Sequence, residues 1–458
     1  MIDLIWQQWY YIYNLNLIIT NVLQTEKNMI DSLKKFIDNS QTAYQAVQTL
    51  KNRLLGDGYV MLNEGDEFKI EQGKKYFVVR DGSSLIAFKV GNIDNYYYKI
   101  IASHTDSPAL KIKFDGENVN LDCRKLETEV YGGPILYSFF DRPLKVAGRV
   151  VVERDGKIVS VPVVAKTNVV LPSVAVHLQR QVNSSFAPNA QTDMQPLCGL
   201  GVDKTYIDDI TKDVLCKNDR IYDYDLFVTC AQEGFFSGAN DEFFSSPRID
   251  NLASVISSIE ALEKSDGDGI SVACLYDNEE VGSGTKQGAA GDFLYETLKR
   301  VNRSLKKSDD EFSAAVFKSF MLSCDGAHAT HPNHAELSCQ PGKIYLGKGV
   351  VIKHHANQNY TTDAVSSSVI KKILQNGKIS CQDFFMRSDM PCGSTLGAIS
   401  SRHLSLRSVD VGIAQLSMHS QVETIATSDY GNLVEALTAF LNAKINQTAY
   451  GEITVETK

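Results

Sequence analysis

The sequence lacks a C-x-x-C pair, and its nine cysteines are scattered and odd in number. This spacing excludes a zinc ribbon and argues against a disulfide framework, so we expect reduced thiols of the kind found in the cytoplasm. An excess of basic residues is also missing, because the net charge is -9 and the lysines and arginines are dispersed along the chain. We therefore expect neither nucleic acid nor an anionic membrane as a partner.

The N-terminal stretch, residues 1–28, has no basic residue before Lys27, whereas a secretory signal normally begins with positive charge. Polar residues from Gln7 onward interrupt its apolar run, which argues against a membrane-spanning helix. Two interpretations stay open. The stretch is an extension that serves as a propeptide or partner-binding helix, or it reflects the choice of start site, since Met-Ile-Asp at residue 29 repeats the sequence at residue 1.

A chain of 458 residues is too long for one small core, so we expect two domains or one large domain with an insertion. Apolar strands alternate with helical patterns in residues 29–113 and 241–458, which indicates an α/β domain. Between them, residues 114–240 carry short alternating strand patterns with a turn at Asp155-Gly156. This texture favours a β-rich insertion.

Two adjacent carboxylates, Glu279 and Glu280, follow the apolar residues 272–276 directly after a predicted buried strand. Loops at strand ends are where α/β proteins hold their sites. Neighbouring glutamates repel each other unless positive charge lies between them, and a metal ion supplies that charge most directly. One glutamate can then bind metal while the other takes a proton from water. Considered alone, such a pair is more often a solvated acidic turn.

Histidines and aspartates adjoin other apolar segments in the same way. His104 ends a predicted strand, and Asp106 can fix the tautomer of its ring. Asp250 lies just before a helical pattern, where it is equally typical of a helix N-cap. Asp325 and His419 each follow a further strand. Each of these residues has an ordinary structural explanation when it is considered alone.

Together, these loops offer the ligand set of a two-metal hydrolase. A bridging carboxylate holds two cations roughly 3.5–4 Å apart, each cation takes one histidine and a further carboxylate, and a spare carboxylate serves as base. Imidazole combined with carboxylate suits zinc or manganese, whereas magnesium prefers oxygen ligands alone. The sequence therefore predicts two divalent metal ions, with zinc first and manganese or cobalt as alternatives.

The motifs around these residues resemble those of the M18 metallo-aminopeptidases, which include the aspartyl aminopeptidases. The resemblance covers about residues 32–444 and rests on motifs that stand in the family's order: SHTDSP, HLQRQVN, SPRIDNL, DNEEVGS, CDGAHATHPN, RSDMPCGSTLG and QLSMHS. It implies an α/β catalytic domain with a mixed sheet, interrupted by a β-rich dimerisation domain at residues 114–240. It also implies a homo-oligomer built from dimers, a dodecamer. Residues 1–28 have no counterpart in the shorter family members.

The resemblance also implies roles for individual residues. The residues that it assigns to metal are His104 and Asp325 for one ion, Glu280 and His419 for the other, and Asp250 as the bridge. Glu279 would be the general base, and Asp106 would orient His104 from behind the metal. His177, which lies in the β-rich insertion, would enter the active site of a neighbouring subunit. From spacing alone, His177 belongs to an ordinary amphipathic segment.

Lys353 is the residue on which the predicted substrate preference rests. It follows the apolar residues 350–352, which carry its ammonium toward the interior, where it needs an anionic partner. From sequence physics alone it is more often a solvated lysine beside a strand. The matching lysine of the aspartyl aminopeptidases pairs with the substrate's first side chain, which implies a preference for N-terminal Asp or Glu. We place His328 and Asp389 in the same substrate-binding region.

The predicted activity is hydrolytic removal of one N-terminal residue from peptides. The alternatives are a member of the same family that prefers neutral residues, a related exopeptidase or deacylase, and an inactive shell-forming scaffold. An aminopeptidase should reject a peptide whose N-terminus is blocked. This assay therefore separates an aminopeptidase from the related exopeptidase or deacylase. Against the scaffold, every ligand position is occupied in this sequence.

Overall fold

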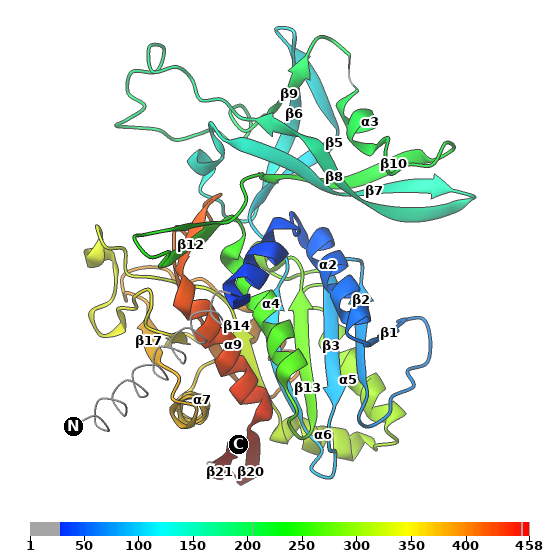
Figure 1. Ribbon diagram of the computed structural model, residues 1–458, viewed down its shortest axis with the longest axis vertical. Coiled ribbons are helices and arrows are strands. Elements are labelled where there is room, and N and C mark those ends of the chain that lie inside the picture. Colours follow the sequence, from blue (N-terminus) through cyan, green and yellow to red (C-terminus); the bar gives the residue numbers. More distant parts are fainter. Residues whose placement is uncertain (1–27, 204, 450–451, 458) are drawn as a thin grey trace, which may run out of the picture.

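The computed structural model describes residues 28–203, 205–449 and 452–457, and it shows an α/β body beside a β-barrel (Figure 1). Apart from its last residue, the N-terminal stretch 1–28 lies outside the described residues. Within the described ranges, no helix has the length and apolar character needed to cross a membrane. All nine cysteines lie in these ranges and are free thiols, as the sequence predicts.

A 13-stranded mixed sheet forms the centre of the α/β body. Along its main path the strands are β1 (Val60–Leu62), β2 (Lys75–Arg80), β3 (Ser84–Val90), β13 (Ile270–Tyr276), β4 (Tyr98–His104), β14 (Phe320–Cys324), β18 (Arg407–Leu416), β19 (Glu423–Ala426), β12 (Phe243–Ser246) and β11 (Phe235–Ser237). Off this path lie β15 (Ala327–His328), β16 (Val350–His354) and β17 (Cys381–Phe385). The neighbours β13, β4, β14 and β18 run parallel to one another, so their carboxyl ends meet at one edge.

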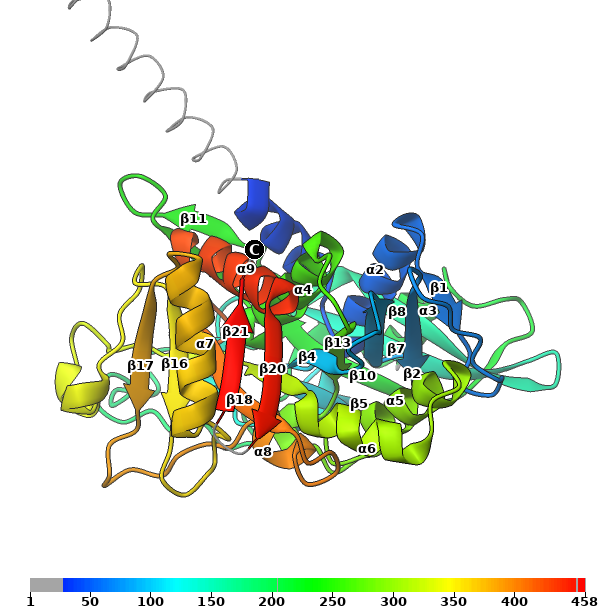
Figure 2. The same ribbon diagram turned by 90° about the horizontal axis from the view of Figure 1, so that it is seen from below.

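Helices cover both faces of this sheet (Figure 2). One face packs against residues 28–38, α2 (Ala43–Gly56), α4 (Ile249–Lys264), α7 (Ala364–Asn376) and α9 (Thr427–Asn442). The other face packs against α5 (Phe293–Ser304), α6 (Asp309–Lys318) and α8 (Leu396–Ser400). Because side chains alternate along a strand, Ile101 of β4 enters the first core while Ile100 and Ala102 enter the second. A strand buried on both faces reads as a continuous apolar run, which is the sequence pattern from which β4 is predicted.

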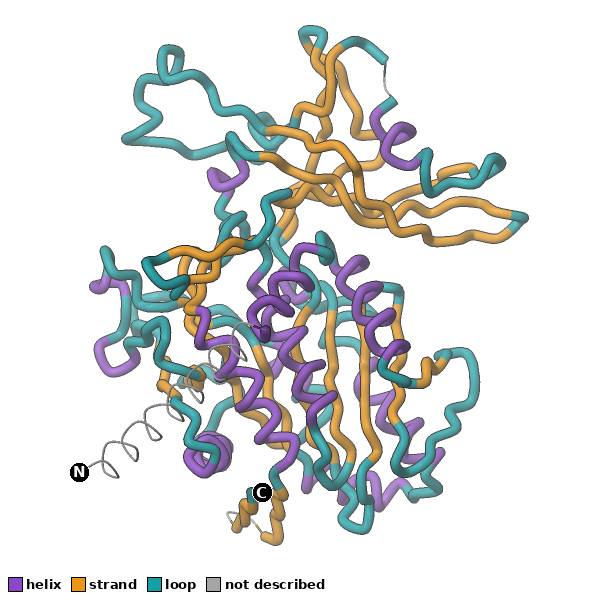
Figure 3. Tube along the Cα trace, in the orientation of Figure 1, coloured by secondary structure: helices purple, strands orange, loops and turns teal. Residues whose placement is uncertain are grey.

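The β-rich body is a closed barrel with the strand order β10-β5-β6-β9-β8-β7. Its elements are β5 (Ala109–Asn120), β6 (Cys123–Tyr131), β7 (Pro143–Arg154), β8 (Lys157–Val170), β9 (Leu197–Leu200), α3 (Tyr206–Thr211) and β10 (Arg220–Cys230). Figure 3 shows that strands dominate this body, whereas helices flank the strands of the other. The barrel strands therefore span residues 109–230, while β11 and β12 pair with the large sheet. The mixed α/β architecture with an additional β-rich part confirms the predicted fold class.

Short elements complete the chain. They are the 3-10 helices η1 (Leu136–Phe139), η2 (Glu279–Val281), η3 (Ala335–Leu337) and η4 (Gln340–Gly342), and the hairpin of β20 (Lys444–Ala449) and β21 (Glu452–Glu456). Of these, η2 matters most for function, because it carries the adjacent glutamates.

Candidate metal centre

The carboxyl ends of the parallel strands bring the predicted ligands to one edge of the sheet. His104 is the last residue of β4, and Asp325 follows β14 directly. The two glutamates of η2 come shortly after β13, and His419 comes shortly after β18. Asp250 lies at the start of α4, where its backbone angles are not helical and its peptide bond to Asn251 is cis. The helix proper therefore begins after Asp250, as the sequence predicts.

The ligand atoms form two overlapping clusters that share Asp250. His104 Nε2 lies 3.4 Å from Asp250 Oδ1 and 3.5 Å from Asp325 Oδ1. His419 Nε2 lies 3.5 Å from Asp250 Oδ2 and 3.4 Å from Glu280 Oε2. The two oxygens of Asp250 thus face different histidines, which is the arrangement that a bridging carboxylate requires.

Hydrogen bonds fix the orientation of both histidine rings. Nδ1 of His104 lies 3.1 Å from the carbonyl oxygen of Asp106, and Nδ1 of His419 lies 3.0 Å from that of Gly133. A carbonyl oxygen only accepts, so each Nδ1 carries the proton and donates. Each Nε2 then faces the carboxylates and is the atom that can bind a metal ion once it gives up its proton.

The donor set fits divalent metal ions. Oδ1 of Asp250 and Oε1 of Glu280 are buried and have no hydrogen-bond partner among the described residues, which is costly for carboxylates that nothing else compensates. Donors about 2.1 Å from a common tetrahedral ion stand about 3.4 Å apart. The separations of 3.4 to 3.5 Å match that spacing and are too long for strong hydrogen bonds.

The electrostatics of the cluster also call for added positive charge. Burial raises the pKa of Glu279 to about 8, and burial followed by repulsion from Asp250 raises the pKa of Glu280 well above its usual range. Burial lowers the pKa of His419, but hydrogen bonding to Asp250 and the charge of Glu280 outweigh it and raise that pKa to about 10. Several carboxylates in one buried site cannot all ionise without a cation between them.

Two carboxylates behind the ligands hold the segments in place. Asp106 accepts the backbone N–H of Glu279 and that of Glu280, each at 3.1 Å, and the Tyr131 hydroxyl at 2.7 Å. Glu423 accepts the N–H of Asp250 at 2.9 Å and that of His419 at 2.8 Å. Asp106 is predicted from the sequence, whereas Tyr131 and Glu423 lie in no recognisable sequence pattern.

The barrel also contributes to the site through Gly132. This glycine has φ of +74°, and a Cβ atom there would lie 3.1 Å from Cβ of Glu280. Glycine therefore permits both the left-handed backbone and the close approach of the barrel to η2. A Gly-Gly pair after a predicted strand is the sequence signal for such an approach.

Lys353 lies at the edge of the cluster and is 2% exposed. Its ammonium is 3.2 Å from Oδ2 of Asp325 and donates to the carbonyl of Gly326 at 3.0 Å. Its anionic partner within the chain is thus a predicted metal ligand. His328, whose pKa is lowered by burial and then by the charge of Lys353, packs edge-on against Phe384 on the same side.

The structure does not bring the remaining predicted residues to the cluster. Asp389 is exposed and forms a two-armed ion pair with Arg387. His177 lies exposed in the long segment between β8 and β9, which extends from the barrel away from the α/β body (Figure 1). Its neighbours Val176 and Leu178 are 52% and 83% exposed.

An α/β sheet whose parallel strands end in converging histidines and carboxylates is the architecture of a metal-dependent hydrolase. The sequence model of one family, described as Aminopeptidase I zinc metalloprotease (M18), matches residues 36–441. The chain belongs to this family of zinc metalloproteases, and it is an aminopeptidase.

Curated relatives resemble the chain over nearly its whole length. The probable M18 family aminopeptidase 2 of Clostridium novyi (strain NT) is 40% identical over 428 residues, which cover 90% of this chain and 98% of the relative. The probable M18 family aminopeptidase 2 of Pseudomonas fluorescens (strain SBW25) is 36% identical over 415 residues, which cover 88% and 96%.

Solved structures share the fold. A chain of the cryo-EM structure of the Ape4 and Nbr1 complex has a TM-score of 0.87 at 34% identity, covering 91% of this chain and 86% of that one. The mApe1 of Chaetomium thermophilum has a TM-score of 0.81 at 28% identity, with coverages of 91% and 97%. The S. cerevisiae mApe1 dodecamer, at 23% identity and a TM-score of 0.78, covers 91% and 97% and shows a likeness of fold alone.

Proposed function

We propose that this aminopeptidase uses two divalent metal ions, zinc first, and that it prefers acidic N-terminal residues. The bridge position of Asp250 carries the first part of the proposal, because its two oxygens lie 3.4 and 3.5 Å from two different histidines. The residues that would hold the ions are His104 and Asp325 for one, Glu280 and His419 for the other, and Asp250 for both. Manganese and cobalt use the same kinds of ligand and stay alternatives.

Both the metal ions and the side chains of the protein take part in the reaction. When bound, the ions acidify a water molecule and polarise the scissile carbonyl. Glu279 accepts a proton from the attacking water and donates it to the leaving amine. Burial raises the pKa of Glu279 to about 8, which supports its role as the group that takes up this proton. Asp106 holds the backbone of Glu279 and so fixes where that carboxylate stands.

Metal content tests the two-ion proposal. Purified wild-type protein should contain two equivalents of metal, and Asp250→Ala should lose both because the bridge serves both ions. His419→Ala should weaken only the ion that Glu280 also binds, and it is therefore the matched control. Two full equivalents in Asp250→Ala would contradict the assignment.

The acidic preference rests on the unused donor of Lys353. An ammonium has three donors, and Asp325 and the Gly326 carbonyl occupy two of them. The ring of Tyr360 also lies 5.1 Å from the ammonium, and within the described residues no further hydrogen-bond acceptor takes the third donor, which we assign to a carboxylate of the substrate. His328 packs edge-on against Phe384, the residue that pairs with Lys353 between β16 and β17, and this supports its place in the substrate region. Asp389, paired with Arg387, has no comparable support from the contacts of the described residues, and its role stays a prediction.

Lys353→Met tests this preference through a ratio of substrates. A charge-assisted hydrogen bond is worth about 1.5–3 kcal/mol, so kcat/KM for Asp- and Glu-peptides should fall about 10- to 150-fold relative to that for Leu-peptides. The ratio is the proper measure because losing the partner of Asp325 will also lower the rate with every substrate. Faster cleavage of Leu-peptides than of Asp-peptides by wild type would favour the neutral-residue alternative.

We also propose a homo-oligomer assembled from dimers, with a dodecamer as the final form. The fold that the chain shares with the mApe1 dodecamer supports this assembly. The exposed segment that carries His177 supports a role for this histidine in a neighbouring subunit, because it contacts nothing in its own site among the described residues. The free cysteines agree with a cytoplasmic location, which likewise stays a prediction.

A further inference from the structure

Asp410 is a fully buried carboxylate beside Lys353 in the large sheet. It belongs to β18 and stands directly opposite Lys353 in the antiparallel pair that β18 forms with β16. Residues that stand directly opposite each other in such a pair project from the same face of the sheet. The carboxylate of Asp410 and the ammonium of Lys353 therefore leave the sheet at neighbouring positions on one face.

The carboxylate of Asp410 holds two loops. Its Oδ2 accepts the N–H of Thr361 at 2.6 Å and the hydroxyl of Thr361 at 2.9 Å, and its Oδ1 accepts the hydroxyl of Thr395. Thr361 lies between β16 and α7, and Thr395 lies between β17 and α8. The loops also contact each other, because Nδ2 of Asn359 donates to the carbonyl of Cys392 at 2.9 Å. One buried carboxylate thus fixes both loops to β18.

The same loops contribute to the surroundings of the Lys353 ammonium. Tyr360 directly precedes Thr361, and its ring lies 5.1 Å from Nζ of Lys353. The ring of Tyr360 also packs against that of Phe384, and Cys392 of the second loop packs against the apolar cluster to which both rings belong. A shift of either loop therefore changes the walls around the ammonium to which we assign the carboxylate of the substrate.

We propose that Asp410 is a positioning residue for substrate specificity, which holds the two loops so that the pocket around Lys353 receives an acidic side chain. This inference rests on the function proposed for Lys353 and adds a residue that acts behind it. The three hydrogen bonds that the carboxylate accepts all come from the loops. Because Asp410 shapes the pocket for the side chain and not the place of the scissile carbonyl, its loss should raise KM for acidic peptides more than it lowers kcat.

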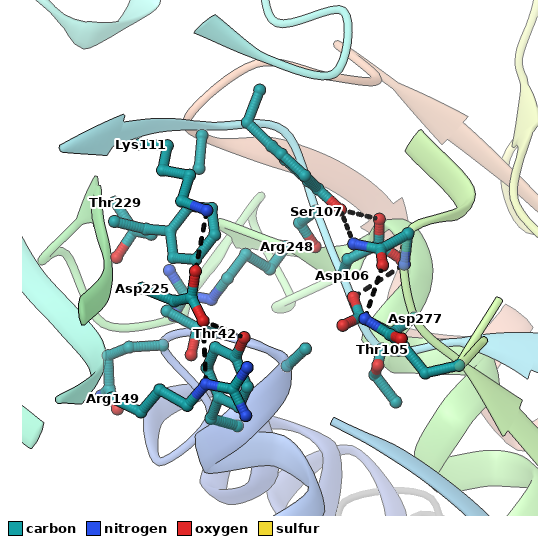
Figure 4. A pocket seen from close by; sticks show the side chains of 18 residues that line it. Thr42, Thr105, Asp106, Ser107, Lys111, Arg149, Asp225, Thr229, Arg248 and Asp277 are labelled. Atoms are coloured by element: carbon teal, nitrogen blue, oxygen red, sulfur yellow. Dashed lines mark hydrogen bonds and ion pairs between the residues drawn. The ribbon is translucent and has the colours of Figure 1, made fainter. Parts of the chain in front are cut away.

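A control for this role needs a carboxylate that fixes a loop elsewhere. Asp225 is a poor match, because it pairs with two cations beside a cavity of about 240 Å³ between the barrel and the α/β body (Figure 4). Asp429 is fully buried and accepts the N–H groups of Gly347 at 2.7 Å and Gly349 at 2.9 Å. These glycines precede β16, whereas Lys353 lies near the end of that strand. Asp429 is therefore the matched control.

Steady-state kinetics of the zinc-loaded enzyme with an Asp-peptide and a Leu-peptide tests the proposal. Asp410→Ala should raise KM for the Asp-peptide by about 10-fold, which corresponds to one hydrogen bond to a charged group, and should change KM for the Leu-peptide less. Asp429→Ala should lower the midpoint of thermal unfolding and keep the wild-type ratio of the two KM values. An unchanged ratio in Asp410→Ala, or the same change in both variants, would overturn the proposal.

Thr395→Val tests the proposal even where Asp410→Ala does not fold. It removes one donor to Asp410 and keeps the β-branched shape, so it should shift the KM ratio in the same direction. In a Lys353→Met background it should change the ratio no further, because the ammonium that the loops surround is gone. A further change there, or a wild-type ratio in Thr395→Val, would overturn the proposal.

The outcome for wild type separates this inference from the function on which it rests. A wild-type enzyme without a preference for acidic peptides would overturn both. An acidic preference that Lys353→Met removes and Thr395→Val leaves intact would overturn the role of Asp410 alone.

Discussion

Replacing Asp106 by asparagine tests how the metal centre is held together. The carboxylate of Asp106 receives the N–H groups of Glu279 and Glu280 on its two oxygens, and Tyr131 donates to one of them. Asparagine keeps one acceptor oxygen and puts an NH₂ group in the place of the other. At least one backbone N–H of η2 will then face another donor, so η2 must move or lose a hydrogen bond.

The size of the effect follows from the bonds that are lost. A hydrogen bond to a charged group is worth about 1.5–3 kcal/mol, and about 1.4 kcal/mol corresponds to a factor of ten. One lost bond therefore predicts a 10- to 150-fold loss. The usual cost of removing a partner behind a metal ligand, about 10- to 100-fold in metal affinity or activity, lies in the same range.

The assay measures two quantities in the wild type and in each variant. The first is zinc affinity, by competition with a chelator, and the second is kcat/KM for an Asp-peptide at saturating zinc. Asp106→Asn should lose in both, because Glu280 is a proposed ligand and Glu279 the proposed base. Tyr131→Phe is the control, since it removes one neutral donor and leaves the carboxylate in place. Its loss should be smaller than that of Asp106→Asn, because both backbone N–H groups of η2 keep their carboxylate acceptor. Wild-type zinc affinity together with wild-type kcat/KM in Asp106→Asn would refute the argument.

Three further predictions concern the base, the neighbouring subunit and a helix cap. Glu279→Gln should keep both metal ions and lose roughly 10²–10⁴-fold in kcat; loss of metal instead would mean that the roles of the two glutamates are exchanged. Mixing inactive Glu279→Gln and His177→Phe subunits should restore part of the activity, and verified mixed oligomers that stay inactive would place His177 outside the neighbouring site. Ser308 caps α6 in a capping box with Glu311, so Ser308→Ala should lower the free energy of unfolding by about 1 kcal/mol in denaturant titrations without changing kcat. The backbone N–H of Ser308, followed by Lys307, lowers the pKa of Glu311 to about 2 from 4.5, so the contribution of the Glu311 carboxylate is present at neutral pH and is lost as the pH falls through about 2; a destabilisation by Glu311→Ala that is the same at pH 7 and well below pH 2 would contradict this mechanism.

The strands that carry the candidate metal centre, and the clustering of its histidines and carboxylates, could be predicted from the sequence because each signal is local. An apolar run followed by a polar loop marks β4, β13 and β14, and a parallel sheet brings such ends together whatever lies between them in sequence. Glu423 could not be found in this way. It belongs to β19, and it acts by accepting backbone N–H groups of Asp250 and His419, an interaction that leaves no pattern in the residues around it.

Lys353 and His177 show two further limits of sequence reasoning. The apolar residues before Lys353 predict a buried ammonium in need of an anion, and the structure agrees, but only the fold reveals that Asp325 is the partner. Spacing alone makes His177 part of an amphipathic segment, whereas the segment is exposed beyond the barrel. A periodic apolar pattern indicates a surface that will be covered, and it cannot say whether the cover comes from the same chain.

The hydrogen bonds of Asp106 and Glu423 explain how loops far apart in sequence present ligands at matched distances. Asp106 joins the end of β4 to η2, and Glu423 joins the start of α4 to the loop of His419. Each carboxylate accepts hydrogen bonds from backbone N–H groups. It therefore positions the main chain and leaves the side chains of the proposed ligands free to face the ions. Because the segments are already ordered, metal binding costs the site little conformational entropy. The barrel strengthens the same arrangement through Gly132 and through the carbonyl of Gly133, which accepts a hydrogen bond from Nδ1 of His419. The β-rich body is therefore part of the candidate metal centre within a single chain, in addition to the dimerisation role that the family resemblance implies for it.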